Sequence, residues 1–209
     1  DMDVDASNLT GLERIPGMEV VGWLNEQQRP LAKLAIRFRS ANYGATFKFT
    51  PRTPRITATT LTNVRITPKE IQETLFFRFQ VSDAGVRELS VLVPKAFEKA
   101  RLPDALRQSG RVLQKIVEPA TGADGKPLAG WVKVRFVLPE FVDGQIDVGL
   151  TYDRLLADQK QEVAIPDIVA GRLDQRLIVL ENSGRDEVVV DKSTGLEPLT
   201  EGQKAWDDL

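Results

Sequence analysis

The chain has 209 residues, with 28 Lys and Arg against 30 Asp and Glu, and it contains neither Cys nor His. This composition excludes disulfides, thiolate and imidazole metal ligands, and the Ser-His-Asp and Cys-His catalytic groups. The net charge of −2 also offers no basic surface for nucleic acid, whereas chemistry by carboxylates, Lys or Tyr stays open.

No apolar run approaches the roughly 20 residues that span a membrane. The chain opens with Asp1-Met2-Asp3 and lacks the basic and apolar regions of a signal peptide. We therefore interpret it as a segment of a longer protein, whose targeting signals lie elsewhere.

The first predicted strands show an apolar residue at every second position. Leu34, Ile36 and Phe38 alternate with Ala35 and two arginines, and residues 45–49 repeat the pattern with Phe47 and Phe49. Residues 40–44 between them have turn chemistry, so the two runs predict a hairpin.

Longer alternating runs follow. Residues 55–67 are rich in Thr, Val and Ile and predict a strand. Residues 75–81 give the clearest alternation, and Asp83-Ala84-Gly85 predicts a turn into a further strand at 89–93. Together these runs predict a β-meander.

The next section changes character. Residues 95–108 fit one or two short helical turns broken by Pro103, and residues 121–127 predict a polar hairpin tip. Strands are predicted at 132–138 and 146–152, separated by Asp143-Gly144, and again at 163–165, 177–180 and 188–190.

Short strands at this spacing predict an all-β protein, an antiparallel β-sandwich of immunoglobulin-like or related type, with a short helical insertion near 95–108. We predict three parts. Residues 1–16 end a preceding unit or linker, 17–160 form the principal sandwich, and 161–209 form a smaller strand unit that begins the next repeat.

Two stretches of the sequence resemble each other. Val4-Asp5-Ala6-Ser7 leads, after Asn8 and Leu9, into Thr10-Gly11-Leu12-Glu13. Val190-Asp191-Lys192-Ser193 leads directly into Thr194-Gly195-Leu196-Glu197. One hypothesis is a tandem array with about one period in this chain. The alternative is coincidence, because these residues are common and only two copies are present.

Two motifs carry a resemblance to a known class. Residues 54–62 spell Pro-Arg-Ile-Thr-Ala-Thr-Thr-Leu-Thr, and residues 84–94 spell Ala-Gly-Val-Arg-Glu-Leu-Ser-Val-Leu-Val-Pro, with the strand 77–81 between them. This pair resembles β-sandwich segments of very large, uncharacterised bacterial envelope proteins. The resemblance covers about residues 34–190, implies a surface or periplasmic setting, and brings no catalytic residue with it.

Four residues are candidates for ligand binding. Trp131 and Phe76 lie on the faces opposite the apolar rows 132–136 and 77–79, and outward aromatics of this kind could stack on a sugar ring. The alternative is burial under another layer, since large aromatics usually fill cores. Arg37 and Arg39 belong to a basic stripe that could meet anionic polysaccharide or headgroups. The alternative is pairing with acids on neighbouring strands.

Three further patterns are weaker. Asp1, Asp3, Asp5 and Ser7 have the spacing of the first calcium-loop ligands, but Ala6 replaces the required Gly and position twelve is Leu12. Residues 122–127 lack the first Gly and the final Ser or Thr of a phosphate loop. The acids Asp186, Glu187, Asp191 and Glu181 surround a late strand, where a turn of exposed acids is the simpler explanation than a hydrolase site.

We therefore expect a non-catalytic structural or interaction module of a large extracytoplasmic bacterial protein, without cofactor or metal. Its expected partners are other domains of the same protein, envelope proteins or polysaccharide, and neither nucleic acid nor a membrane span. The expected location is the periplasm, the cell envelope or the exterior. A carbohydrate-binding module that uses Trp131 and Phe76 is the first alternative, and a carboxylate-based hydrolase is the second.

Overall fold

We describe the chain from a computed structural model, which covers residues 2–122, 124–156, 160–163, 165–184, 188–190 and 195–199. Strands dominate the described residues, as the alternating sequence predicts. The strands are β1 (Met2–Thr10), β2 (Leu12–Ile15), β3 (Ala35–Phe38), β4 (Gly44–Pro51), β5 (Arg55–Ile66), β6 (Glu70–Pro94), β7 (Gln114–Thr121), β8 (Pro127–Leu155), β9 (Asp167–Ile168) and β10 (Arg172–Asn182). The helical turns are the 3-10 segments η1 (Gly17–Glu19), η2 (Val21–Trp23), η3 (Arg29–Leu31) and η4 (Lys95–Lys99), and the short helix α1 (Asp104–Ser109).

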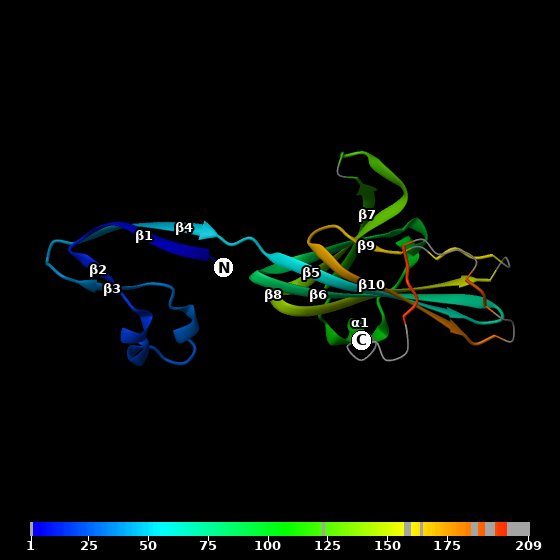
Figure 1. Cartoon of the computed structure of the whole chain (residues 1–209), viewed down its shortest axis with the longest axis horizontal. Coiled ribbons are helices and arrows are strands. Elements are labelled where there is room, and N and C mark those ends of the chain that lie inside the picture. Colours follow the sequence, from blue (N-terminus) through cyan, green and yellow to red (C-terminus); the bar gives the residue numbers. More distant parts are fainter. Residues whose placement is uncertain are drawn as a thin grey trace.

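The main body is a β-sandwich made from one continuous sheet that folds over on itself (Figure 1). Strands run in the order β10-β5-β6-β8-β7, and β9 pairs with β6. The first layer holds β10, β5, the first half of β6 and the second half of β8. The second layer holds β9, the second half of β6, the first half of β8 and β7. The predicted sandwich class is thus confirmed.

The two layers share β6 and β8, which bend together through a corner at residues 82–87 and 138–143. Phe77 pairs with Val148 before the corner, and Leu89 pairs with Phe136 after it, in the same register. Asp83 and Gly144 take positive φ angles of 70° and 81° at the bend. Left-handed residues turn the strands sharply without ending them.

The turn predicted at Asp83-Ala84-Gly85 is therefore wrong, and the two strands predicted on either side of Asp143-Gly144 are parts of one strand. Residues 70–81 pair with 144–155 rather than with 88–94, and both long strands continue through the corner. Asp-Gly sequences favour left-handed backbone, which a hairpin and a corner need equally. Local sequence cannot distinguish the two, because the choice depends on the distant pairing partner.

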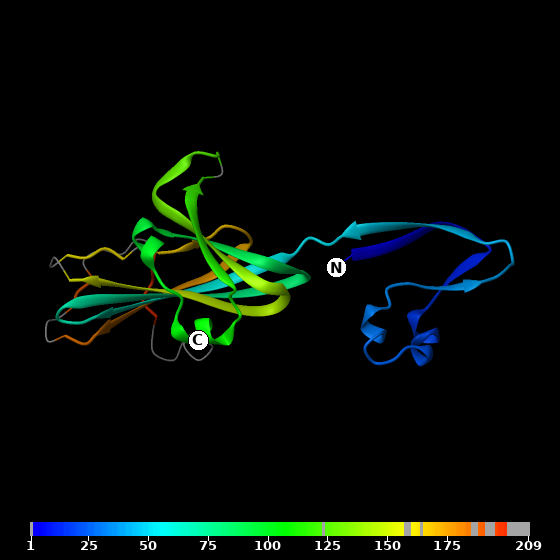
Figure 2. The ribbon, with the colours of Figure 1, turned by 180° about the vertical axis from the view of Figure 1, so that it is seen from behind.

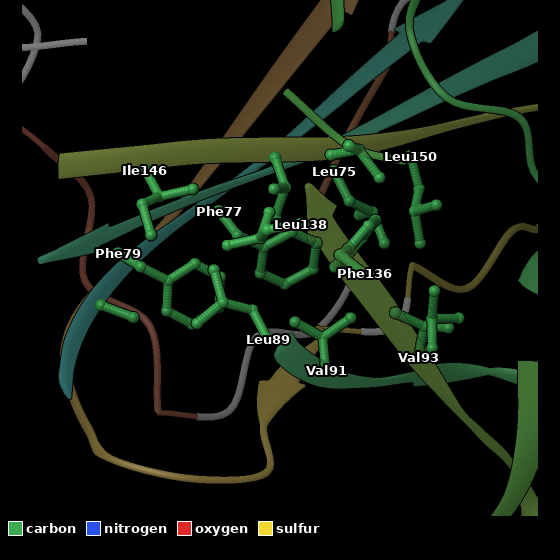
Figure 3. Close-up of a cluster of buried hydrophobic side chains, with 14 of the residues drawn as sticks. Leu75, Phe77, Phe79, Leu89, Val91, Val93, Phe136, Leu138, Ile146 and Leu150 are labelled. Atoms are coloured by element: carbon green, nitrogen blue, oxygen red, sulfur yellow. The ribbon is translucent and has the colours of Figure 1, made fainter. Parts of the chain in front are cut away.

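The core lies between the two layers (Figure 3). The rings of Phe77 and Phe136 lie 6.5 Å apart, although their strands belong to different layers, and Phe77 lies 6.4 Å from Phe79. Alternate residues of both layers interdigitate there and are almost fully buried, as a close-packed interior requires. The fully buried large side chains include Ile71, Leu75, Phe77, Phe79, Val81, Val91, Val93, Val134, Phe136, Leu138 and Leu150.

The helical insertion and one hairpin lie where the sequence predicts them. η4 and α1 occupy residues 95–109 with Pro103 between them, and Phe97 of η4 is buried against Tyr152 at a ring separation of 5.3 Å. Thr121 of β7 pairs with Pro127 of β8, which confirms the polar hairpin tip. No helix among the described residues is long and apolar enough to cross a membrane.

The hydrogen-bonded sheets divide the chain at other places than the predicted ranges 1–16, 17–160 and 161–209. The sandwich sheet begins at Arg55 and includes β10, which pairs parallel to β5 at its edge. Residues 2–51 make no strand pairs with that sheet. The predicted strand at 177–180 lies within β10, whereas residues 163, 165 and 188–190 are not in strands.

A second, smaller unit precedes the sandwich. β1 pairs with β4 and β2 pairs with β3, so residues 2–15 and 35–51 form one long two-stranded structure, here called the ribbon. η1, η2 and η3 form its tip. In both views the ribbon extends away from the sandwich (Figures 1 and 2), and residues 52–54 connect β4 of the ribbon to β5 of the sandwich.

The predicted hairpin between 34–39 and 45–49 is wrong for the same reason as the corner turns. β3 and β4 are successive parts of one arm, and each pairs with the N-terminal arm. Gly11 marks the break between the two pairings, with φ of +61°. A Cβ at Gly11 would lie 2.2 Å from the carbonyl oxygen of Asn42, so only glycine fits.

Candidate interaction surface

The part of the ribbon formed by β1 and β4 has one apolar and one polar face. Paired residues of neighbouring strands project to the same side. Phe47 pairs with Ala6 and Phe49 pairs with Val4, which builds the apolar face, whereas Asp5 pairs with Lys48 on the polar face. The apolar face consists of Met2, Val4, Ala6, Phe47, Phe49 and Pro51.

Most of this apolar face is open to solvent. Phe47 is 49% exposed and Phe49 is 60% exposed, while Ala6 is the buried residue beneath them. Further large apolar side chains of the ribbon and its tip are exposed as well, namely Met2, Met18, Trp23, Leu31, Phe38 and Tyr43. Large apolar side chains left uncovered on one strand face are typical of an interaction site in a folded protein.

Arg37 and Arg39 of the predicted basic stripe lie on the ribbon, and each is paired with an acid of the ribbon or its tip. Arg37 pairs with Glu19 and Arg39 pairs with Glu13. Arg14 pairs with Asp5 and thereby lowers the pKa of that carboxyl group. The structure thus brings Arg37 and Arg39 beside acids of the ribbon, the arrangement expected for cross-strand charge neighbours.

The two predicted aromatics belong to different layers of the sandwich. Phe76 pairs with Gly149 in the first layer and is 41% exposed, whereas Trp131 pairs with Pro94 in the second layer and is half-buried. Both project away from the core, and the outer faces of two stacked layers point in opposite directions. The structure therefore does not bring Phe76 and Trp131 together into one platform.

Trp131 lies instead beside a row of charges on the outer face of the second layer. Lys133 donates to Glu118 at 2.6 Å, Arg135 donates to the same carboxylate at 2.7 Å, and Arg135 also pairs with Glu88 at 2.8 Å. The row crosses β7, β8 and β6. Hydrogen bonds from Lys133 and Arg135 lower the pKa of Glu118.

This row should contribute to the pH dependence of stability. A carboxyl group with a lowered pKa in the folded state stabilises the fold above its unfolded pKa of about 4.3, and the contribution is lost as the pH falls through the folded value. We expect Glu118→Gln to show a smaller loss of unfolding free energy between about pH 6 and pH 3 than the wild type. Denaturant titrations at the two pH values measure it, and an equal loss would contradict it.

Two ionisable side chains project toward the interior. Glu73, 6% exposed, lies in the core-facing row of β6 and pairs with Arg154 of β8 at 3.4 Å. The amino group of Lys115 donates to the carbonyl oxygens of Ala100 and Glu98 at the end of η4, and burial lowers its pKa. The contacts of Glu73 with Arg154 and of Lys115 with two carbonyl oxygens satisfy their charges within the fold.

The junction of ribbon and sandwich forms a shallow polar cleft of about 470 Å³. Arg52 donates to Asp3 at 2.7 Å, and Arg55 lies 3.4 Å from Asp83. Binding pockets for small molecules are mostly apolar and enclosed. The paired charges of this cleft are more typical of a connection between two units.

The remaining acidic candidates do not converge among the described residues. Asp3 and Asp5 pair with Arg52 and Arg14, and Glu181 accepts a hydrogen bond from Asn63. No group of three acids that could hold a metal ion occurs in the described part of the chain. Asp1, Asp186, Glu187 and Asp191 lie outside it.

Comparison of the chain with protein-family models, with curated proteins and with solved structures finds no match. Sequence reasoning missed Phe47 and Phe49 as surface residues, because their alternation predicts a covered face. It also missed Glu73, although its position two residues before Leu75 places it in the core-facing row.

Proposed function

We propose that this chain is a non-catalytic interaction module of a large extracytoplasmic bacterial protein, and that it binds a protein partner through the apolar face of the ribbon. The observation that carries the proposal is the exposure of Phe47 and Phe49 on a two-stranded structure outside the sandwich. An isolated two-stranded ribbon is marginally stable in water, so a covering partner would stabilise it.

The chemistry of the chain supports a binding role over catalysis. It has no imidazole or thiol, and the candidate acids in the described part of the chain, Asp3, Asp5, Glu118 and Glu181, are each engaged with a cation or an amide. Charges of both signs are interspersed, which does not favour nucleic acid as partner. The extracytoplasmic setting rests on the resemblance of residues 54–62 and 84–94 to envelope proteins.

The double variant Phe47→Thr/Phe49→Thr tests the proposed surface. Threonine keeps the β-propensity of the strand while removing both rings. We expect it to bind an environment-sensitive apolar dye at least about twofold less than the wild type, because much of the uncovered apolar area is lost. The unfolding free energy of the sandwich should change by less than about 0.5 kcal/mol.

Thr50→Ser on the polar face of β4 is the control and should leave dye binding unchanged. Undiminished dye binding by the double variant would show that these rings are not the accessible apolar surface. Binding on a glycan array that is lost in Trp131→Ala would contradict the proposal in favour of a carbohydrate-binding module, and turnover of a glycan substrate would contradict its non-catalytic character.

A further inference from the structure

The sandwich has one long strand edge that is open. β10, orange in Figure 1, pairs with β5 along one side, and no strand among the described residues pairs with its other side. The free side of an edge strand presents backbone donors and acceptors that can pair with a strand of another chain.

The other edges of the sandwich are short or blocked. Arg101 exchanges two backbone hydrogen bonds with Thr151 and thereby covers the free side of β8 in the first layer. The edge strand β7 contains Pro119, a residue type that blunts strand edges. β9 has only two residues, whereas β10 has 11. The long edge of β10 is therefore the exception among the edges of the sandwich.

The backbone of β10 presents hydrogen-bonding groups on its open side. Ser183 donates to the carbonyl oxygen of Ile66, which continues the parallel ladder between β10 and β5. Alternate residues of a parallel strand direct their backbone groups to opposite sides. Val179 therefore bonds toward β5, while Ile178 and Leu180 direct their backbone N–H and C=O outward. No described residue pairs with these outward groups.

The second half of β10 is also apolar. Residues 177–180 spell Leu-Ile-Val-Leu, and neither a proline nor a charged residue interrupts them. Ile178 and Leu180 lie in the core-facing row, and Leu180 is nevertheless 43% exposed. The first half of β10 is engaged instead, because Arg176 pairs with Asp167 beside β9 at 2.8 Å. The open edge, defined here as residues 177–182, thus lacks the features that usually prevent strand addition.

We infer that this open edge pairs with the open edge of a second copy of the chain, antiparallel about a twofold axis. Outward backbone groups must meet outward groups, which permits only every second register. In the favoured register Val179 lies opposite Val179 of the second copy, and Ile178 lies opposite Leu180. The neighbouring registers place Leu180 opposite Arg176 or Val179 opposite Glu181.

The favoured register also brings no like charges together. Leu177 lies opposite Glu181, and Arg176 lies opposite Asn182, so no cation faces a cation and no acid faces an acid. The same surface serves both copies, so the contact closes as a dimer and does not grow into a chain. The first layers of the two sandwiches then form one continuous sheet. This contact uses no residue of the ribbon and goes beyond the proposed function.

A disulfide tests the register directly, since the chain has no Cys of its own. Val179 directs its backbone toward β5, so it forms a non-hydrogen-bonded pair with Val179 of the second copy. The Cα atoms of such a pair lie about 4.5 Å apart, within the range of about 4.4–6.8 Å that a disulfide requires. Val179→Cys should form a covalent dimer under mild oxidation. Thr74→Cys, on the same outer face but on the central strand β6, should stay monomeric.

Two charge variants give an independent readout by sedimentation velocity. Val179→Lys and Val179→Glu each place like charges at the twofold axis, so each alone should self-associate at least about fivefold more weakly than the wild type. An equimolar mixture of the two should associate at least as strongly as the wild type, because opposite charges then meet. Few residues take part in the contact, so the measurement extends to about 1 mM protein.

A wild-type chain that stays monomeric at about 1 mM would overturn the inference. Equal cross-linking of Val179→Cys and Thr74→Cys would overturn it as well. The ribbon variant Phe47→Thr/Phe49→Thr should dimerise like the wild type. If that variant alone loses self-association, the contact between copies lies on the ribbon, which refutes pairing through β10 and leaves the proposed function intact. The dye experiment judges the proposed function separately.

Discussion

Phe77→Ala is expected to lower the free energy of unfolding of the sandwich by about 3–5 kcal/mol. Phe77 is 1% exposed, and its ring contacts Phe79 of its own layer and Phe136 of the opposite layer. Truncation removes the transfer energy of the ring and leaves a cavity that the rigid strands cannot fill. The loss is large compared with the total stability of a typical domain, about 5–15 kcal/mol.

The neighbouring Phe76→Ala is the matched control, since the same residue type is removed from the other face of the same strand. Phe76 is 41% exposed, so we expect a cost of about 1–1.5 kcal/mol. Denaturant titration measures both. If Phe77→Ala fails to fold, Phe77→Leu can be measured in its place. It should lower the free energy of unfolding by about 1–2 kcal/mol. Equal costs at positions 76 and 77 would mean that the layers do not meet as described.

This contrast between positions 76 and 77 shows what alternation in a sequence can establish. The assignment of Phe77 and Phe79 to one face and Phe76 to the other follows from the two-residue period of a strand, and the structure confirms the buried row. The helical insertion at 95–108 could also be predicted, because that run loses the alternation and contains Pro103.

Pairing partners could not be predicted in the same way. The residue types at the corner, Asp83 and Gly144, are equally typical of a hairpin turn. The strands bend there instead because β6 and β8 continue to pair on both sides of the corner. The parallel pairing of β10 with β5 could not be predicted from the sequence either. An apolar run such as 177–180 is compatible with parallel and antiparallel neighbours alike.

The candidate surface was missed for a related reason. The alternation of Phe47 and Phe49 predicts an apolar strand face, and that face exists. Whether a second layer covers it depends on the arrangement of whole units in space. The ribbon extends away from the sandwich (Figure 2), and no layer among the described residues covers the two rings.

Arg154→Met is expected to destabilise the sandwich by about 3 kcal/mol, because it leaves the carboxylate of Glu73 buried without its counter-charge. Glu73 is 6% exposed and Arg154 is 24% exposed, and they lie 3.4 Å apart across β6 and β8. Arg154 also donates to Gln161 and to the carbonyl of Glu162. Arg154 thus connects residues 161 and 162, which follow β8, to the sandwich through hydrogen bonds.

The matched control lies on the same two strands, facing outward. Arg78 of β6 pairs with Asp147 of β8 at 3.0 Å, and both side chains are more than a third exposed. Solvent screens such a pair, so Arg78→Met should cost less than about 1 kcal/mol. The difference between the two Arg→Met variants isolates the effect of burial, because strand pair and residue type are unchanged.

A second substitution separates the buried charge from the lost packing of Arg154. In Glu73→Leu/Arg154→Met both charges are replaced by apolar groups, and the double variant should regain most of the stability that Arg154→Met loses. The coupling between the two positions should then be about 1–3 kcal/mol in unfolding titrations. Additive losses would show instead that Arg154 acts through its contacts with residues 161 and 162, and that Glu73 tolerates burial without it.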